Sequence, residues 1–149
     1  MSDPRLLALP AEFTFKGKTY KVSPRDFDDE AAFRRWLEGE ELRGIQAHKS
    51  IYSELEYQQQ LAGFRVTCAT GQYSYPMPLC MQGLMSIDGA KYMAFLSLKK
   101  LNPDVTQSLV EEIFADDAKW EELRLIRQGL DDPNSRKPAQ EAQRPHHDL

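Results

Sequence analysis

Cysteine is scarce in this sequence, and so are long apolar runs. Cys68 and Cys80 are the two cysteines of a 149-residue chain, which is too few to indicate a disulfide framework. No run of about twenty apolar residues occurs, which excludes a membrane-spanning helix. The apolar part of the opening segment MSDPRLLALP is too short for a signal peptide. We therefore expect a cytoplasmic protein without a membrane partner.

The sequence also lacks an excess of basic charge. Nineteen Lys and Arg residues stand against twenty-three Asp and Glu residues, which leaves a net charge of −4. Basic residues come together only as short pairs such as Arg34-Arg35 and Lys99-Lys100. A mildly acidic chain has no basic field to attract phosphates, so we expect no nucleic-acid partner.

Recognisable catalytic patterns are absent as well. The sequence contains no G-x-S-x-G elbow, no Walker loop and no dinucleotide-binding glycine pattern. Paired acids such as Asp28-Asp29 and Glu111-Glu112 fall where helix starts or solvated helix faces are expected. The sequence therefore predicts no enzymatic activity, no catalytic residue and no cofactor.

Residue types that bind metals are few and widely spaced. Zinc sites commonly use a C-x-x-C pair or a partnered histidine motif, and neither is present. His146-His147 stands in a polar segment with no third ligand near it. We therefore predict no metal site and interpret the cysteines as free structural thiols. A small enzyme with an unrecognised site around Cys68, Cys80 and His48 is kept as an alternative.

The first positive signal is the alternation of apolar residues in EFTFKGKTYKV, residues 12–22. Phe13 and Phe15 share one face of a first strand, and Tyr20 and Val22 share one face of a second. Gly17-Lys18 can supply the tight turn between the two strands. This pattern predicts a β-hairpin, which must lie against helices because a lone hairpin is barely stable.

Helical periodicity follows the hairpin. A first helix is expected to start at Ser23-Pro24, or alternatively at Asp26 or Asp28, and to weaken at the glycines 39 and 44. Its apolar stripe consists of Phe33, Trp36 and Leu37. Ile51, Leu55 and Ala62 mark a second helix, for which Gly63 is the expected end. Residues 64–70 can form a short strand, 71–78 are irregular, and 79–84 can add a helical turn.

Periodicity is strongest after Asp88. A largely buried helix is expected there, and Asn102-Pro103 ends it because the residue before proline avoids helical backbone angles. Thr106 can cap the next helix, and Asp116-Asp117 begins a final one. The expected apolar stripes of these last two helices are Leu109, Val110, Ile113 and Phe114, and then Trp120, Leu123, Ile126 and Leu130.

These elements predict a mainly α fold with a small N-terminal β-hairpin, of class α+β. We expect one compact helical domain over residues 12–130, with the hairpin at 12–22 and a flexible start at 1–11. Residues 131–149 contain three prolines and no aromatic residue, which is typical of a disordered polar tail.

Five side chains are candidates for contact with another protein, because tyrosine and methionine are favoured at interfaces. They are Tyr52, Tyr57, Tyr73, Tyr75 and Met77. Packing inside the domain is the alternative, and it is the better interpretation for the pair on the second helix, Tyr52 and Tyr57.

The order of these features resembles the tail assembly chaperones of long-tailed bacteriophages and related prophages. The similarity covers about residues 12–130, and its most specific part is AFLSLKKLNPDVTQSLVEEIF, with Asn102-Pro103 and Thr106 at the helix corner. The resemblance implies a non-enzymatic protein of the host cytoplasm. Such a chaperone would bind the tape-measure protein and the tail-tube protein, and it could also form a homo-oligomer. A structural or adaptor subunit of the phage particle is the alternative function.

Overall fold

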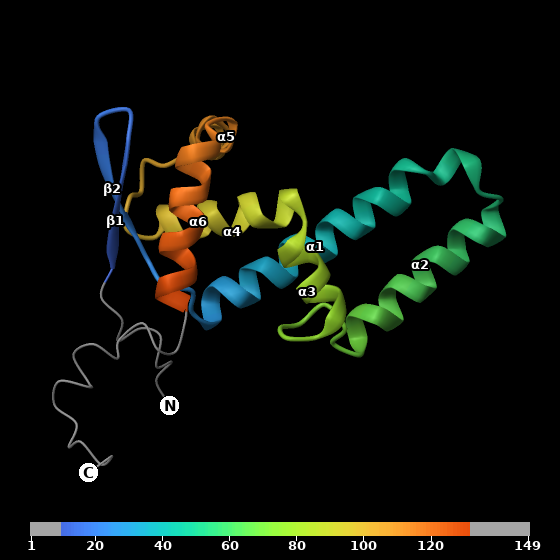
Figure 1. Ribbon diagram of the computed structural model, residues 1–149. Helices are drawn as coiled ribbons and strands as arrows, with labels where there is room; N and C mark the ends of the chain where they lie inside the picture. The colour runs from blue at the N-terminus through green and yellow to red at the C-terminus, as the bar shows by residue number, and fades with distance from the viewer. Residues whose placement is uncertain (1–9, 132–149) are drawn as a thin grey trace, which may run out of the picture. The chain divides into compact units, whose positions relative to one another are not determined.

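A computed structural model of the chain describes residues 10–131, which contain one β-hairpin and six α-helices (Figure 1). The mainly α fold with an N-terminal hairpin is thereby confirmed. The described chain forms two compact units: unit 1 holds residues 10–27 and 94–131, and unit 2 holds residues 28–93. The expected tail over 131–149 and the expected flexible start lie almost wholly outside the described residues.

The hairpin of unit 1 consists of β1 (Ala11–Phe15) and β2 (Lys18–Val22), paired antiparallel with Phe13 opposite Tyr20. Lys16 and Gly17 both have positive φ, 51° and 78°, as a two-residue type I′ turn requires. The turn is thus one residue earlier than Gly17-Lys18. The alternation is confirmed, because the side chains of Phe13, Phe15, Tyr20 and Val22 are all buried.

The core of unit 1 joins this hairpin to the end of α4 (Ile87–Lys99), to α5 (Gln107–Ala115) and to α6 (Asp117–Asp131). Helix α6 packs along β1 (Figure 1). The predicted stripes of α5 and α6 are confirmed, with Val110, Ile113 and Leu123 almost fully buried. The complete buried cluster is Phe13, Phe15, Tyr20, Val22, Ala94, Leu98, Val105, Val110, Ile113 and Leu123.

The Asn102-Pro103 corner is tied to the hairpin by the Asn102 side chain. Its Nδ2 donates hydrogen bonds to the carbonyl oxygens of Lys21 and Leu98, each at 2.7 Å, and its Oδ1 accepts from the Lys21 amide at 3.1 Å. The side-chain amide therefore pairs with β2 as the peptide group of a third strand would. Thr106 caps α5 as predicted, because its hydroxyl accepts from the Leu109 amide at 3.2 Å.

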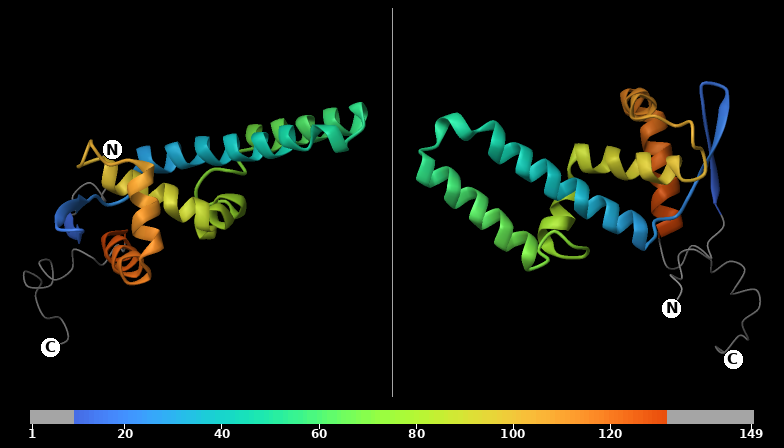
Figure 2. Two further views of the ribbon diagram at one scale, coloured as in Figure 1. Left: turned by 90° about the horizontal axis from the view of Figure 1, so that it is seen from above. Right: turned by 180° about the vertical axis from the view of Figure 1, so that it is seen from behind.

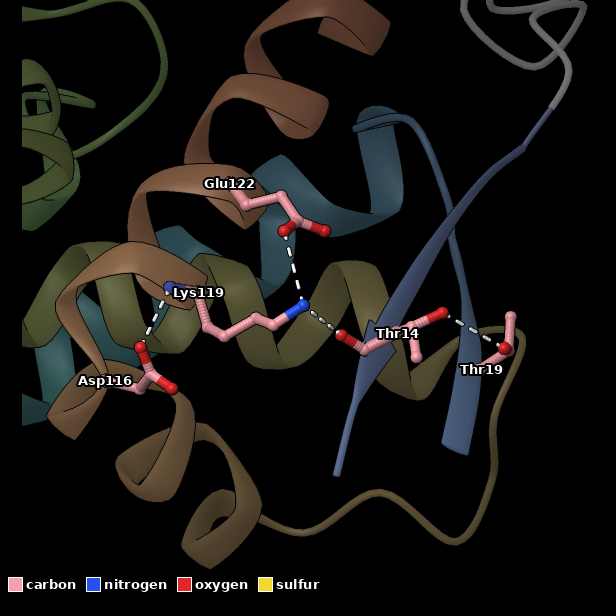
Figure 3. Close-up of polar contacts among 5 residues, drawn as sticks. All are labelled: Thr14, Thr19, Asp116, Lys119 and Glu122. Atoms are coloured by element: carbon pink, nitrogen blue, oxygen red, sulfur yellow. Dashed lines mark hydrogen bonds and ion pairs between the residues drawn. The ribbon is translucent and has the colours of Figure 1, made fainter. Parts of the chain in front are cut away.

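Lys119 fastens α6 to β1 (Figure 3). Its Nζ donates to the Thr14 carbonyl oxygen at 2.9 Å and lies 3.3 Å from Glu122 Oε1. The backbone amide of Lys119 donates to Asp116 Oδ1 at 3.2 Å, and Asp116 is the residue directly before α6 begins. Across the hairpin, the hydroxyls of Thr14 and Thr19 lie 3.1 Å apart.

Unit 2 is built on two antiparallel helices that lie side by side in both views, α1 (Phe27–Ala47) and α2 (Glu54–Ala69) (Figures 1 and 2). The short 3₁₀ helix η2 (Lys49–Ile51) connects them. Ser53 and Glu56 form a reciprocal capping box at the start of α2, which satisfies two amide groups there. Helix α3 (Pro78–Met85) and the first half of α4 complete the unit.

Several expectations for unit 2 are wrong. Helix α1 begins directly after Asp26, in agreement with one of the alternative starts, but it continues through both of its glycines rather than weakening there. Helix α2 continues past Gly63 to Ala69, so residues 64–69 are helical rather than a strand. A glycine costs a helix only about 1 kcal/mol relative to alanine, and packing of the neighbouring side chains outweighs that cost.

Aromatic rings form the centre of unit 2. The Phe33 ring lies 5.4 Å from Trp36 and 6.4 Å from Tyr92, and Trp36 stacks on Tyr92 at 5.0 Å between centroids. The buried apolar side chains of this unit are Phe33, Tyr57, Tyr73, Cys80 and Met93. Helix α4, which begins in unit 2, continues without interruption into unit 1.

Candidate functional site

Residues 66–87 form the longest stretch of this sequence without a charged residue or histidine. Charged residues make up 28% of the whole chain, so a gap of 22 residues is unusual for it. The stretch lies within unit 2 and covers the end of α2, the following loop and all of α3. Charged side chains are depleted at the centres of protein interfaces, which makes this stretch the first candidate for partner contact.

The second half of this stretch exposes large apolar side chains. Met85 is 86% exposed and Ile87 is 61% exposed, while four others lie between 36% and 38%. Among the described residues these are six of the twelve exposed large hydrophobic side chains. We name the group the 75–87 patch; it consists of Tyr75, Met77, Leu79, Met81, Met85 and Ile87.

Helix α3 presents part of this patch because its opposite side is packed. Cys80 and Gly83 are buried, whereas Met81 and Met85, four residues apart, lie together on the exposed side. A side chain on Gly83 would meet Leu37 at 3.0 Å and Phe33 at 3.3 Å. Glycine at this position therefore lets α3 lie close against α1, and this close packing fixes which side of α3 faces outward.

The five residues proposed for partner contact have different environments. Tyr57 and Tyr73 are buried, and Tyr52 is half-buried. Tyr75 and Met77 are exposed and belong to the 75–87 patch. Tyr75 and Met77 are therefore the two that a partner would reach most directly.

The inner residues around this site are held by packing rather than poised for chemistry. The Tyr73 ring packs against Phe64 at 6.2 Å, and burial raises the pKa of its hydroxyl, with a further contribution from Glu41. Burial also raises the pKa of the Cys68 thiol, and the Glu38 carboxylate adds to that effect by charge and by a hydrogen bond. A raised pKa lowers the thiolate fraction, so Cys68 is not activated as a nucleophile.

Two open grooves carry polar side chains. One, of about 310 Å³, lies between α1 and α2 and is lined by Glu41, Ile45 and Tyr73 among others. The other, of about 170 Å³, lies beside the Asn102-Pro103 corner and is lined by Lys18, Tyr20 and Asp104 among others. Neither set of lining residues contains histidine or cysteine. Within residues 10–131, no three His, Cys, Asp or Glu side chains are grouped so that they could hold a metal ion.

Four members of the patch were missed at the level of sequence: Leu79, Met81, Met85 and Ile87. The tyrosines and prolines of the sequence mark the loop but not α3. The missing charge over residues 66–87 is the signal that would have found them, because a helix with no charged residue cannot have an ordinary solvated face.

The described helices include none long and apolar enough to cross a bilayer. Comparisons with protein-family models, with curated proteins and with solved structures gave no match. The expectation of a tail assembly chaperone therefore depends on the resemblance of the sequence alone.

Proposed function

We propose that this chain is a non-enzymatic tail assembly chaperone of the host cytoplasm, which binds the tape-measure protein and assists assembly of the tail tube. The observation that carries the proposal is the 75–87 patch, an exposed, uncharged and methionine-rich surface. Methionine side chains are flexible and polarisable, so they adapt to clients whose apolar side chains differ along their length. A long helical client with repeated apolar stripes is a partner of that kind.

The division of the chain into two units also supports a binding role. Unit 1 has a closed apolar core of its own, so its stability does not depend on covering the patch in unit 2. The patch can then be covered by a client and uncovered again, as a chaperone that leaves the finished tail requires.

Co-expression tests this function. A tape-measure protein of a long-tailed phage, the proposed client, is expressed with and without the chain, and the soluble fraction of the client is measured. We expect the client to stay soluble with the natural chain and to pellet with the Met81→Ser/Met85→Ser variant. The matched control is Leu101→Ser/Leu125→Ser, which removes two exposed apolar side chains from unit 1 and should leave the client soluble. A client that pellets equally with and without the natural chain would refute the proposal.

The alternative function, a structural or adaptor subunit, would use the same exposed patch for a permanent contact. Mass spectrometry of purified virions separates the two functions. The chaperone should be missing from mature particles, whereas a structural subunit should be present in a fixed copy number.

A further inference from the structure

Helix α2 has two apolar faces on opposite sides. Its inner face consists of Tyr57, Leu61, Phe64 and Cys68, which follow one another at spacings of four, three and four residues. Its outer face consists of Leu55, Ala62, Val66 and Ala69, at spacings of seven, four and three. The inner spacing is that of a continuous helical stripe, whereas the outer stripe skips one turn, at Gln58 and Gln59; the two stripes are centred roughly half a turn apart.

The inner face is packed and the outer face is not. Tyr57 is 8% exposed and Phe64 packs on Tyr73, whereas Leu55 is 69% exposed and Val66 is 63% exposed. Both views show α1 alongside α2 on one side only, and no other described element of unit 2 covers the opposite side (Figures 1 and 2). Isolated exposed apolar residues are ordinary, but four exposed apolar residues on one uncovered face of a helix suit a second helix.

Charges beside the outer face indicate which helix this is. Glu54 and Arg65 are eleven residues apart, so they lie on the same flank of the stripe, within about 20° of each other around the helix. Leu55 and Val66 are also eleven residues apart. One flank of α2 thus carries an acid beside the leucine end and a base beside the valine end.

We propose that α2 pairs with α2 of a second copy of this chain in an antiparallel, two-fold arrangement. Leu55 would then pack against Val66 of the second copy, and Glu54 would lie beside Arg65 of the second copy. Two-fold symmetry repeats both contacts, with the axis crossing the outer face midway between Leu55 and Val66. The small side chains of Ala62 and Ala69 let the two helices approach closely.

The same charges disfavour the parallel arrangement. In an antiparallel two-fold pair, the flank with Glu54 and Arg65 meets the same flank of the second copy. In a parallel two-fold pair, it meets the flank on the other side of the stripe. Glu54 would then face Glu56 of the second copy, and Arg65 would face Gly63, which has no side chain. The antiparallel pair therefore gains two attractions where the parallel pair has two repulsions. This self-pairing surface contains no residue of the 75–87 patch, so the proposal does not depend on the proposed client.

Charge reversal tests the contact on the full chain without any client. Arg65→Glu and Glu54→Arg each place like charges together twice, so each should weaken the dimer about tenfold in sedimentation equilibrium. The double variant Glu54→Arg/Arg65→Glu restores opposite charges and should recover most of the affinity. Arg124→Glu, at an exposed position of α6 in unit 1, is the matched control and should leave the affinity unchanged. A natural chain that is monomeric at all concentrations, or single and double variants that dimerise alike, would overturn the proposal.

Cysteine cross-linking tests the direction, in a Cys68→Ala/Cys80→Ala background whose fold is checked by circular dichroism. Ala62→Cys lies on the outer face close to the level of the two-fold axis and should form a disulfide with its own counterpart. Leu55→Cys should not do so, because its counterpart lies about 16 Å away along the axis, beyond disulfide reach. A mixture of Leu55→Cys and Val66→Cys chains should form the heterodisulfide. Efficient self-linking of Leu55→Cys would indicate a parallel pair and contradict the proposal.

Discussion

Units 1 and 2 use their apolar side chains in opposite ways. Among the described residues, unit 1 has ten buried hydrophobic side chains and exposes three large ones, Phe27, Leu101 and Leu125. Unit 2 has five buried and exposes nine. Unit 1 is therefore organised around its own core, whereas unit 2 leaves three times as many large apolar side chains exposed to other chains. This difference separates the part that maintains the fold from the part that we propose binds.

The largest expected difference in the free energy of unfolding comes from placing an aspartate at an isoleucine position of each unit. Ile113→Asp buries a carboxylate at a fully buried position of unit 1 and should cost about 4 kcal/mol or more, enough to unfold that unit. Ile87→Asp makes the same exchange at a 61% exposed position in the first turn of α4, where an acid suits the helix dipole. It should change the stability by about 0.5 kcal/mol or less.

The chain provides a separate reporter for each unit in this experiment. Its two tryptophans are Trp36 in unit 2 and Trp120 in unit 1. In a Trp36→Phe background, Trp120 fluorescence should be that of an unfolded chain for Ile113→Asp and native for Ile87→Asp. A soluble Ile113→Asp protein with native Trp120 emission would show that the two units do not differ in this way.

A glycine substitution should have the second largest effect, this time in unit 2. A methyl group on Gly89 would overlap the carbonyl oxygen of Gly83, so Gly89→Ala forces the backbone of α3 and α4 apart and should cost about 3 kcal/mol. Gly44→Ala, at an exposed and unobstructed position of α1, should instead gain about 0.5–1 kcal/mol. Urea unfolding followed by Trp36 fluorescence measures both. Equal stability of the two variants would mean that α3 is not tightly packed.

The Asn102 bridge should have an intermediate effect, confined to unit 1. Asn102→Ala removes three hydrogen bonds to Lys21 and Leu98 and should cost about 1–3 kcal/mol. Gln107→Ala, at the exposed start of α5, is the control and should cost little. Thermal unfolding followed by Trp120 fluorescence makes the comparison. A loss confined to Trp36 emission would contradict the assignment of this bridge to unit 1.

The smallest expected effect is a difference between the units at alkaline pH. Burial raises the pKa of Tyr92, and burial also raises that of Tyr73; both belong to unit 2. A raised pKa means that the folded state holds the proton more strongly than the unfolded state does, and this difference stabilises the folded state. The stabilisation is complete below the unfolded pKa of about 10 and is lost as the pH rises above it. Trp36 emission should therefore change at lower pH than Trp120 emission. Tyr92→Phe should reduce the difference in pH between the two emission changes. If Trp36 and Trp120 emission change at the same pH in the natural chain, the predicted difference between the units is absent.

Features set by neighbouring residues were predictable from the sequence. The hairpin follows from alternation around Lys16-Gly17, and the corner follows from Asn102-Pro103 with the Thr106 cap. Helix α2 was less predictable because it carries two apolar stripes. Leu55 marked the helix correctly but lies on its exposed side, while Tyr57 and Phe64 supply the packed side. Which stripe is covered depends on α1 and Tyr73, and such contacts between distant residues leave no local pattern.

The candidate site also depends on contacts between distant residues, which the sequence does not show. The loop tyrosines were visible as a group, but Tyr73 is buried and packs on Phe64 of α2, whereas Tyr75 is exposed. The close approach of α3 to Leu37 required Gly83 to be buried, and the sequence does not indicate which glycines are buried. The lack of charge over residues 66–87 was available from the start and identifies the patch region without any structure.

The order of the units along the chain has a consequence for biosynthesis. The hairpin is made first, but Leu98, Ile113 and Leu123, which cover it, follow only after the whole of unit 2. At ordinary translation speeds, Leu123 leaves the ribosome on the order of 10 s after Val22. During that interval the two strands have no partner and the helices of unit 2 are complete. Nascent chains should therefore acquire native structure in the middle of the sequence before they acquire it at the start.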